Sequence, residues 1–505
     1  MEYKNEKLIE FEKYICGKNV AIIGLGVSNL PLIDYFYNKK SIVTIFDGRE
    51  KSQLPKEVLD KITNYKMKIF TGKDYLSKLN GFNLILRSPS CLPTTPELEK
   101  EAENGAIVTT EIELFMKMCP CQIIGITGSD GKTTTTTLIY EILKNAGYKT
   151  YVGGNIGTPL FTKLSEIMPN DKVVLELSSF QLMGMDISPD IAVITNITPN
   201  HLNVHKDFQE YIEAKKNIFK FQKENGILIL NYDDDITREC SKEAKGKVIY
   251  FSSKQKLDEG FIIEEGIIKE CKDKLRKHVV NTKELIIKGA HNYANICCAL
   301  AVTSTIVDPN DSLETIKKFT GVEHRLEFVK EIDGVKWYND SASTSPSRLI
   351  NALNAFDEDI VLIAGGADKN LDYSPVAKPI LEKVKTLILM GQTADKIFNS
   401  VKKEEENQNK EISIYMAKNL QEAVELAKKH GKKVVLFSPA STSFDMFKDM
   451  YDRGRIFKDI VNAMKWEVTS KYIWRLIKQY YNNITTTLHF YDILIKGIAN
   501  EIKKI

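Results

Sequence analysis

The stretch GITGSDGKTTTTT, residues 125–137, places a glycine-rich loop between an apolar segment and a segment with helical periodicity. The apolar residues 122–126 predict a buried strand, and LIYEILKNAG at 138–147 predicts a helix with one apolar face. Successive backbone N–H groups of such a loop point outward at a helix N-terminus, where they bind phosphate oxygens. The sequence therefore predicts an α/β protein that binds a nucleoside triphosphate.

Two side chains of this loop suit a triphosphate and its metal ion. Lys132 adds a mobile positive charge, and Thr133 adds a hydroxyl ligand for Mg²⁺. The spacing departs from the common G-x-x-x-x-G-K-[ST] pattern, because Ile126 stands where the first glycine belongs. A chance surface turn is the alternative, and the flanking strand and helix argue against it. The candidate triphosphate-binding residues are Gly128, Ser129, Asp130, Gly131, Lys132, Thr133 and Thr134.

Length and composition indicate an ordinary globular protein. The 505 residues exceed what one hydrophobic core usually covers, so we expect roughly three domains. The 70 basic and 67 acidic side chains nearly cancel, which argues against nucleic-acid or membrane binding through charge alone. The 8 cysteines include no C-x-x-C pair, which indicates reduced thiols. The charged N-terminal segment and the lack of an apolar run of about 18 residues predict a cytoplasmic protein without membrane insertion.

The N-terminal segment NVAIIGLGVSN, residues 19–29, predicts the strand, glycine turn and helix of a Rossmann-like unit. Its dinucleotide fingerprint is incomplete, because Asn29 replaces the third glycine, so a dehydrogenase is the weaker interpretation. The same geometry can hold the pyrophosphate of another nucleotide, such as a UDP-sugar. The candidate contacts of that ligand are Gly26, Val27, Ser28, Asp47 and Arg49.

Strands and helices alternate through the rest of the chain, which predicts a central parallel sheet and a third, Rossmann-like αβ domain. After about Trp466 apolar residues recur at helical spacing, so we expect one or two amphipathic helices that pack on the third domain or on a partner subunit. The expected divisions are 1–111 for a UDP-sugar-binding domain, 112–321 for a central P-loop ATPase-like domain, 322–465 for a C-terminal domain and 466–505 for a helical extension.

Three further residues could carry chemistry near the loop. Glu176 ends an apolar strand, where a carboxylate can hold Mg²⁺ or serve a structural role. The run NITPNHLNVH at 196–205 follows another strand end, and His201 is the better placed of its two histidines, although a lone histidine is usually structural. Lys215 has Lys216 beside it, and the residues alone predict a solvated helix face.

The order of motifs over residues 19–464 resembles that of the Mur ligases. This similarity covers the whole chain except its ends. The matching segments are GLGVSN at 24–29, TGSDGKTTTT at 127–136, GGNIG at 153–157, LELSSFQL at 175–182, NITPNHL at 196–202, YIEAK at 211–215, GAHNYAN at 289–295, EHR at 323–325, YNDS at 338–341, GGADK at 365–369 and SPASTSFDMF at 438–447.

The resemblance implies a monomeric, three-domain enzyme that uses ATP and Mg²⁺. Its substrates would be UDP-N-acetylmuramoyl-L-alanine and D-glutamate, joined through an acyl phosphate during peptidoglycan synthesis. By the same resemblance, Glu176 holds a first metal ion, and His201 with a carbamylated Lys215 serves a second. Lys132, His201 and Lys215 would be the catalytic residues.

The resemblance also assigns the remaining contacts, all named here by their position in this chain. For the muramoyl substrate they are Asn155 and Ser178; for the nucleotide Asn292, Asn295, Arg325 and Asp340; and for the incoming glutamate Lys369, Ser443 and Phe444.

Two departures from the family pattern bear on specificity. Ala342 follows Ser341, where many relatives have a lysine that helps bind the glutamate carboxylate. Addition of L-glutamate, or another Mur-type amide ligation, is therefore the nearest alternative. A non-catalytic nucleotide-binding regulator is more distant, because the residues expected to hold a second metal ion are intact. Ser90 stands where glycine is usual in an S-P-G loop, which could alter the uridine site.

Overall fold

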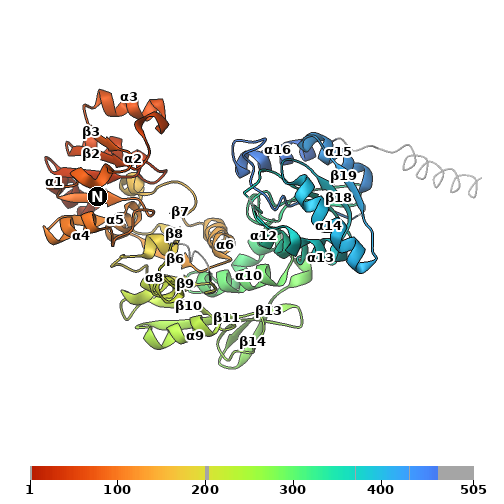
Figure 1. Ribbon diagram of the computed structural model, residues 1–505. Coiled ribbons are helices and arrows are strands. Elements are labelled where there is room, and N and C mark those ends of the chain that lie inside the picture. Colours follow the sequence, from red (N-terminus) through yellow and green to blue (C-terminus); the bar gives the residue numbers. More distant parts are fainter. Residues whose placement is uncertain (1–2, 200–203, 370, 432, 465–505) are drawn as a thin grey trace, which may run out of the picture. The chain divides into compact units, whose positions relative to one another are not determined.

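The computed structural model describes residues 3–199, 204–369, 371–431 and 433–464 (Figure 1). The chain divides into two compact units, Met1–Val322 and Glu323–Ile505. The first unit contains two sheets and the second contains one. The expected extension 466–505 and the candidate residue His201 lie outside the described residues. Within the described part of the chain, every helix is too short or too polar to cross a lipid bilayer.

The first sheet has 5 strands in the order β3-β2-β1-β4-β5, all parallel. The predicted glycine turn follows its central strand, which is apolar and buried on both faces. This burial is typical of parallel sheets covered by helices on both sides. The strands are β1 Asn19–Ile23, β2 Ile42–Asp47, β3 Lys68–Thr71, β4 Leu84–Arg87 and β5 Ile107–Thr109. The helices are α1 Glu6–Ile15, α2 Leu30–Asn38, α3 Lys56–Asn64, α4 Pro96–Glu103 and α5 Glu111–Met118.

The second sheet has 9 strands in the order β14-β13-β12-β11-β10-β9-β6-β8-β7. The phosphate loop follows β6, which lies inside the sheet between β8 and β9. The strands are β6 Gln122–Thr127, β7 Thr150–Gly154, β8 Lys172–Glu176, β9 Ile191–Ile194, β10 Ile227–Asn231, β11 Lys247–Ser252, β12 Gly260–Glu264, β13 Ile267–Lys272 and β14 Leu275–Asn281. The helices are α6 Lys132–Asn145, α7 Ser179–Leu182, α8 Phe208–Lys220, α9 Asp235–Cys240, α10 Ala290–Thr303 and α11 Leu313–Lys318.

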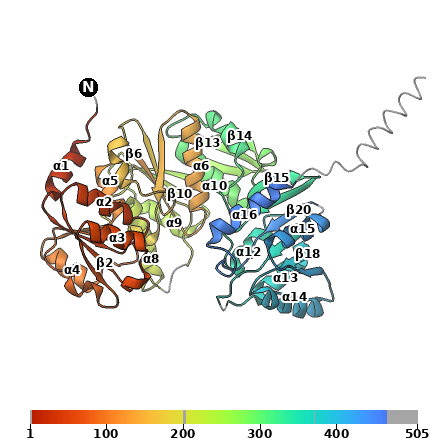
Figure 2. The same cartoon turned by 90° about the horizontal axis from the view of Figure 1, so that it is seen from above.

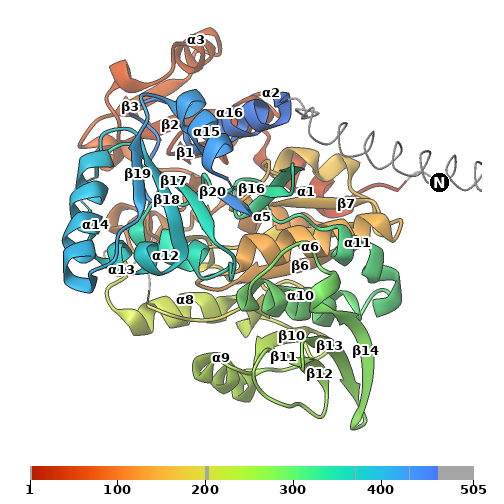
Figure 3. The same cartoon turned by 90° about the vertical axis from the view of Figure 1, so that its right-hand side faces the viewer.

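The second sheet differs from the expected all-parallel sheet at one edge. Strands β12, β13 and β14 pair antiparallel, because short turns at 265–266 and 273–274 connect them as hairpins. Glu265, Asp273 and Lys274 adopt positive φ in these turns. Helices α6 and α10 lie side by side over one face of the sheet, with α11 near the end of α6 (Figure 3). Their apolar faces share a buried cluster that includes Ile126 and Ile296.

The first two sheets join through a shared apolar core. Phe161 of the second domain contacts the rings of Phe11, Tyr35 and Phe36 of the first domain. Its backbone N–H donates to Glu111 Oε1 at 2.9 Å. The two sheets of this unit therefore pack on each other.

The second unit holds 6 strands in the order β15-β16-β20-β17-β18-β19, with only β15 antiparallel to its neighbour. One face of the sheet packs against α12, α13 and α14 and the other against α15 and α16 (Figure 2). The strands are β15 Glu327–Ile332, β16 Val335–Asn339, β17 Ile360–Ala364, β18 Val384–Leu389, β19 Ser413–Met416 and β20 Val434–Phe437. The helices are α12 Pro346–Leu353, α13 Ser374–Lys383, α14 Ala394–Gln408, α15 Leu420–His430 and α16 Met450–Ala463.

Candidate active site

The loop between β6 and α6 requires glycine at two positions. Gly128 has φ +147° and Gly131 has φ +80°, a region that favours glycine. A Cβ on Gly128 would lie 1.9 Å from Thr195 Oγ1, and one on Gly131 would lie 2.3 Å from Asn295 Oδ1. Helix α6 begins at Lys132, so the loop amides lie at its N-terminus. This is the strand, loop and helix that the sequence predicts.

Residues at the end of β9 hold the loop in place. The Asn196 carbonyl accepts from Ser129 N at 2.9 Å, and Asn196 Oδ1 accepts from Asp130 N at 2.9 Å. Thr195 Oγ1 donates to the Asp130 carbonyl at 2.6 Å. Sequence reasoning missed the roles of Thr195 and Asn196, although Asn196 begins the NITPNHL motif that it singled out and Thr195 directly precedes it. These bonds fix the loop geometry before any ligand binds.

Lys132 folds back over the loop. Its Nζ donates to the carbonyls of Gly128 and Ser129, each at 2.8 Å. The ammonium group therefore lies over the loop backbone at residues 128–129. A flexible lysine of this kind supplies positive charge to phosphate as a point charge.

Lys215 is not on a solvated helix face, and that interpretation of the sequence is wrong. Its side chain is 1% exposed, because α8 turns this face toward the sheet. Its Nζ donates to the Gly128 carbonyl at 2.8 Å and lies 4.6 Å from the ring centre of Tyr211. The next residue, Lys216, is the surface lysine, and it pairs with Glu213 and Glu243.

Burial lowers the pKa of the Lys215 ammonium well below its ordinary value, and the Lys132 cation lowers it further. The carboxylates of Asp130 and Glu176 act in the opposite direction. These four charged groups therefore lie close enough to influence one another. A lysine in such surroundings is readily held as a neutral amine.

Glu176 ends β8 beside this cluster and is 2% exposed. Its Oε1 accepts from Asn155 Nδ2 at 2.8 Å. Its Oε2 is buried and has no hydrogen-bond partner among the described residues. A buried carboxylate oxygen without a partner is costly unless a cation satisfies it. The donor set therefore fits a hard divalent cation, which prefers oxygen ligands.

The metal site is only partly described. Thr133, the other expected oxygen ligand, is buried at the start of α6. Among the described residues no group of three histidine, cysteine, aspartate or glutamate side chains gathers as a metal site. The expected third contributor, His201, falls in the undescribed segment 200–203.

The second histidine of the same run is placed clearly. His205 is 2% exposed, and its Nε2 lies 2.9 Å from Ser179 Oγ. Its ring stacks on Phe180 and meets the edge of Tyr211, the residue beneath Lys215. Burial lowers the pKa of His205, so the neutral ring is favoured. Ser178, expected at the muramoyl substrate, caps α7 through a reciprocal pair of bonds with Gln181.

The two asparagines expected at the nucleotide lie on α10. Asn295 approaches Gly131 of the phosphate loop, as described above. Asn292 lies one turn earlier, and its Nδ2 donates to the Lys288 carbonyl at 2.8 Å. The structure therefore brings the loop, Glu176 and Lys215 together with Asn155 and Asn295 in one region of the first unit.

The glycine turn of the first sheet is tied to its own strands. Asn29 Nδ2 donates to the carbonyls of Ile23 at 2.9 Å and Gly24 at 3.1 Å. Asp47 Oδ2 accepts from Leu25 N at 2.8 Å, and both carboxylate oxygens accept from the Arg49 guanidinium. Burial raises the pKa of Asp47, but Arg49 and the backbone donors outweigh it and hold the pKa below its ordinary value. The turn residues Gly26 and Val27 are exposed and Ser28 is half-buried.

The remaining candidates belong to the second unit. Asp340 Oδ2 accepts from Ser438 Oγ at 2.7 Å, and Oδ1 accepts from Leu326 N at 3.2 Å. Burial raises the pKa of Asp340 to about 7, and Arg325 and Arg348 oppose that shift. Of the residues expected at the incoming glutamate, Ser443 is buried, whereas Lys369 and Phe444 are exposed.

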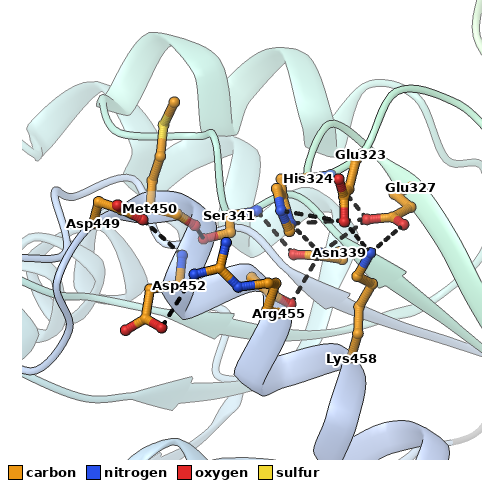
Figure 4. A network of polar contacts seen from close by, with 11 residues as sticks. Glu323, His324, Glu327, Asn339, Ser341, Asp449, Met450, Asp452, Arg455 and Lys458 are labelled. Carbon is orange, nitrogen blue, oxygen red and sulfur yellow. Dashed lines mark hydrogen bonds and ion pairs between the residues drawn. The ribbon is translucent and has the colours of Figure 1, made fainter. Parts of the chain in front are cut away.

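A polar network holds the EHR motif that carries Arg325 (Figure 4). His324 has φ +65° and is 2% exposed. Its backbone N–H donates to Glu327 Oε2 at 2.8 Å, and its Nδ1 lies 2.9 Å from Asn339 Nδ2. Lys458 of α16 donates to the carboxylates of Glu323 and Glu327. These contacts fix the backbone on both sides of Arg325.

Three family matches cover most of the chain. Residues 18–110 match the MurD-like N-terminal domain of Mur ligases, 126–303 the Mur ligase middle domain, and 324–441 the Mur ligase glutamate ligase domain. The first and third matches each contain one sheet, and the middle match contains the second sheet except the first residues of β6.

Individual proteins agree with these matches. UDP-N-acetylmuramoylalanine–D-glutamate ligase of Acetivibrio thermocellus is 46% identical over 465 residues, which cover 91% of this chain and 100% of that protein. The solved structure of a UDP-N-acetylmuramate-alanine ligase from Thermotoga maritima has a TM-score of 0.54 at 18% identity and covers 89% of this chain and 100% of its own. The solved MurF ligase of Thermotoga maritima in complex with ADP has a TM-score of 0.51 at 17% identity and covers 89% of this chain and 96% of its own. These two structures share the fold. The chain belongs to the Mur ligase family.

Proposed function

We propose that this chain joins D-glutamate to UDP-N-acetylmuramoyl-L-alanine, with conversion of ATP to ADP and phosphate, in peptidoglycan synthesis. The names of its curated relatives support this activity, since they align along nearly their whole length. The observation that carries the chemistry is the phosphate loop, with Lys132 and Lys215 around it and a Glu176 oxygen that has no partner in the described part of the chain. A protein that only bound a nucleotide would not require a buried lysine and a buried glutamate beside this loop.

ATP would bind on the loop between β6 and α6. Residues 128–134 are the proposed phosphate contacts. Backbone N–H groups at the start of α6 and the Lys132 ammonium would bind the phosphates, whereas the N–H groups of Ser129 and Asp130 already donate to Asn196. Asn292 and Asn295 on α10 are further proposed nucleotide contacts in the first unit, and Arg325 and Asp340 are proposed nucleotide contacts in the second unit. The relative solved with ADP supports the choice of an adenine nucleotide.

Mg²⁺ would be held by Glu176 and Thr133, with His201 and a modified Lys215 at a second position. When bound, the ion neutralises charge on the phosphates and orients them for transfer. The unpartnered Oε2 of Glu176 supports this assignment, because a cation there would satisfy a buried anion.

In the first step the alanyl carboxylate attacks the γ-phosphorus of ATP, and the bond to the bridging oxygen breaks. ADP leaves, and an acyl phosphate forms on the muramoyl substrate. Lys132 and the loop amides stabilise the charge that develops on the transferred group, because they are already oriented by Thr195 and Asn196. The amine of glutamate then attacks the acyl carbon, and the tetrahedral intermediate releases phosphate and leaves an amide.

We further propose that Lys215 is carbamylated. A neutral lysine amine is the form that reacts with CO₂, and burial favours that form here. The product carries a negative charge in place of a positive one, which suits a position beside the Lys132 cation and a metal ion. The modification would also remove the cost of burying a second cation next to Lys132.

The two outer domains would hold the other substrates. The glycine turn at residues 26–28, with Asp47 and Arg49, is the proposed UDP site, and Asn155 and Ser178 would contact the muramoyl part. Lys369, Ser443 and Phe444 would contact glutamate. We also propose that the enzyme acts as a cytoplasmic monomer, which size-exclusion chromatography with light scattering would test.

The decisive experiment measures phosphate release and product mass with Mg²⁺-ATP and UDP-N-acetylmuramoyl-L-alanine, using D-glutamate and L-glutamate separately. We expect a product with D-glutamate only, and Ala342 would then be a tolerated departure. A product with L-glutamate only would move the chain to the branch of the family that uses that isomer. The absence of product with either amino acid would contradict the proposed reaction.

A further inference from the structure

Two thiols meet at the joint between α5 and β6. Cys119 and Cys121 flank Pro120, and their Sγ atoms lie 3.6 Å apart. Cys119 Sγ also donates to the Cys121 carbonyl at 3.8 Å. Neither the phosphate loop nor the proposed substrate sites use these residues. The pair therefore needs an explanation of its own.

The local backbone creates the contact. Cys119 ends α5 with φ −61° and ψ 129°, and Pro120 fixes its own φ in the same extended region. In an extended segment the side chains of residues i and i+2 point to the same side. The thiols of this C-P-C segment thus face each other, unlike those of adjacent Cys297 and Cys298 on helix α10, whose side chains diverge around the helix axis.

The two sulfur atoms lie close enough for side-chain rotation to bring them to the length of a disulfide bond. A disulfide has an S–S distance of about 2.0 Å, so the two sulfur atoms need to approach by about 1.5 Å. Rotation of the two side chains can supply such a movement within this short loop. The segment therefore holds its thiols in a reduced arrangement that is prepared for oxidation.

The surroundings favour reaction at Cys119. The contact with Cys121 lowers the pKa of Cys119, and the Lys7 ammonium acts in the same direction, whereas burial and Asp190 oppose the shift. The same contact raises the pKa of Cys121. Cys119, which is 7% exposed, and Pro120 line a surface cavity of about 830 Å³ together with residues 3–7.

We infer that Cys119 and Cys121 form a reversible intrachain disulfide by exchange with a low-molecular-weight disulfide. The Cys119 thiolate attacks one sulfur of that disulfide, and the first small thiol leaves. Cys121 loses its proton and attacks Cys119 Sγ, and the second small thiol leaves. The protein dithiol loses two electrons and two protons, and one small disulfide becomes two small thiols.

The disulfide would link the end of α5 to the start of β6. Cys121 directly precedes β6, the strand that carries the phosphate loop, and Cys119 ends α5. Asn5 Nδ2 donates to the Met118 carbonyl at 3.0 Å, which ties the start of α1 to the same joint. Oxidation would thus add a covalent bond at the chain connection between the first domain and the central sheet.

The test uses the full-length protein in buffers that contain set ratios of oxidised and reduced glutathione. After acid quenching and alkylation of the remaining thiols, trypsin releases residues 118–132, which contain only these two cysteines. We expect this peptide to lose two hydrogens and both alkylation sites together as the ratio becomes oxidising. Residues 14–18, with the single exposed Cys16, provide a matched control that can form only a glutathione adduct.

The variant Cys121→Ser separates the two steps. We expect its peptide to carry one glutathione on Cys119, because the resolving thiol is absent. The inference fails if wild-type residues 118–132 remain fully alkylated when Cys16 is modified. It also fails if the wild-type peptide gains glutathione on both cysteines without forming the internal bond.

Discussion

The two glycine turns of the first unit follow interior strands of their sheets, yet they differ in how their charged groups are paired. Around the first turn, Asp47 pairs with Arg49 and accepts from Leu25 N, and Asn29 donates to the strand end, although the neutral Asn29 Oδ1 is buried without a partner among the described residues. Around the phosphate loop, a carboxylate oxygen of Glu176 is buried without such a partner, and Lys215 is buried beside a second lysine. The charges of the first turn are thus paired within the protein, whereas those of the phosphate loop are left for a ligand to pair.

This difference indicates which of the two turns supports a reaction. A turn whose charged groups are paired internally can bind a ligand through its backbone but has little unpaired charge available for a reaction. A loop that concentrates uncompensated charge is costly for folding and useful for transferring a phosphoryl group. The variants below test this contrast.

Replacement of Lys132 should have the largest effect. We expect Lys132→Ala to lower kcat roughly 100- to 1,000-fold, the loss typical when one group that stabilises transition-state charge is removed. The free energy of unfolding should fall, because the hydrogen bonds from Lys132 to the Gly128 and Ser129 carbonyls are lost and the proposed Lys215 carbamate loses its neighbouring cation. Steady-state phosphate release and thermal unfolding measure the two effects. Lys144→Ala, at the exposed end of the same helix, is the control and should behave like the wild type.

Replacement of the buried Lys215 should have the next largest effect. We expect Lys215→Ala to lower kcat roughly 10- to 100-fold, as found for residues that support a metal site. Added formate or acetate should restore part of the rate, since a small carboxylate can replace the carbamate. The surface variant Lys216→Ala is the matched control. Full activity of Lys215→Ala without added carboxylate would remove this residue from the mechanism.

The first turn should respond in stability rather than in catalysis. We expect Asp47→Asn to lower the free energy of unfolding by about 1.5 to 3 kcal/mol, because it loses charge-assisted hydrogen bonds to Arg49 and Leu25. The Michaelis constant for the UDP substrate should rise while kcat stays near that of the wild type. A drop in kcat like that of Lys132→Ala would break the contrast between the two turns.

The same residue predicts a pH dependence. The folded pKa of Asp47 lies below its ordinary value of 3.8, so its contribution to stability is complete above that value and is lost as the pH falls through the folded pKa. Chemical denaturation at several acidic pH values should show this loss in the wild type. Asp47→Asn should lack that component of the pH dependence.

The smallest effect concerns Asn29. The change Asn29→Gly completes the dinucleotide fingerprint in sequence but removes two hydrogen bonds to the strand end. We expect a loss of about 1 to 2 kcal/mol in the free energy of unfolding and no gain in affinity for a dinucleotide. Isothermal titration with NAD and with the UDP substrate would measure both affinities, and NAD binding by the variant would contradict our interpretation of the turn.

The strand-loop-helix unit around residues 122–147 could be predicted from sequence, because apolar periodicity and glycine positions are local properties. The antiparallel edge of the second sheet was not predicted, since the pairing of β12, β13 and β14 depends on the turns and strands beside them. The roles of Thr195 and Asn196 also escaped prediction, because their bonds to the loop join residues more than 60 positions apart.

The sequence by itself determined the family, the order of elements and the residue types available for phosphate transfer. It could not determine whether Lys215 is buried or solvated, because Lys215 and Lys216 are adjacent residues of the same type. Only the packing of α8 against β6 decides that one lysine is buried with a lowered pKa and the other pairs with carboxylates at the surface. The physical reason is that a pKa depends on the charges and the solvent around a group, and residues distant in the chain supply both.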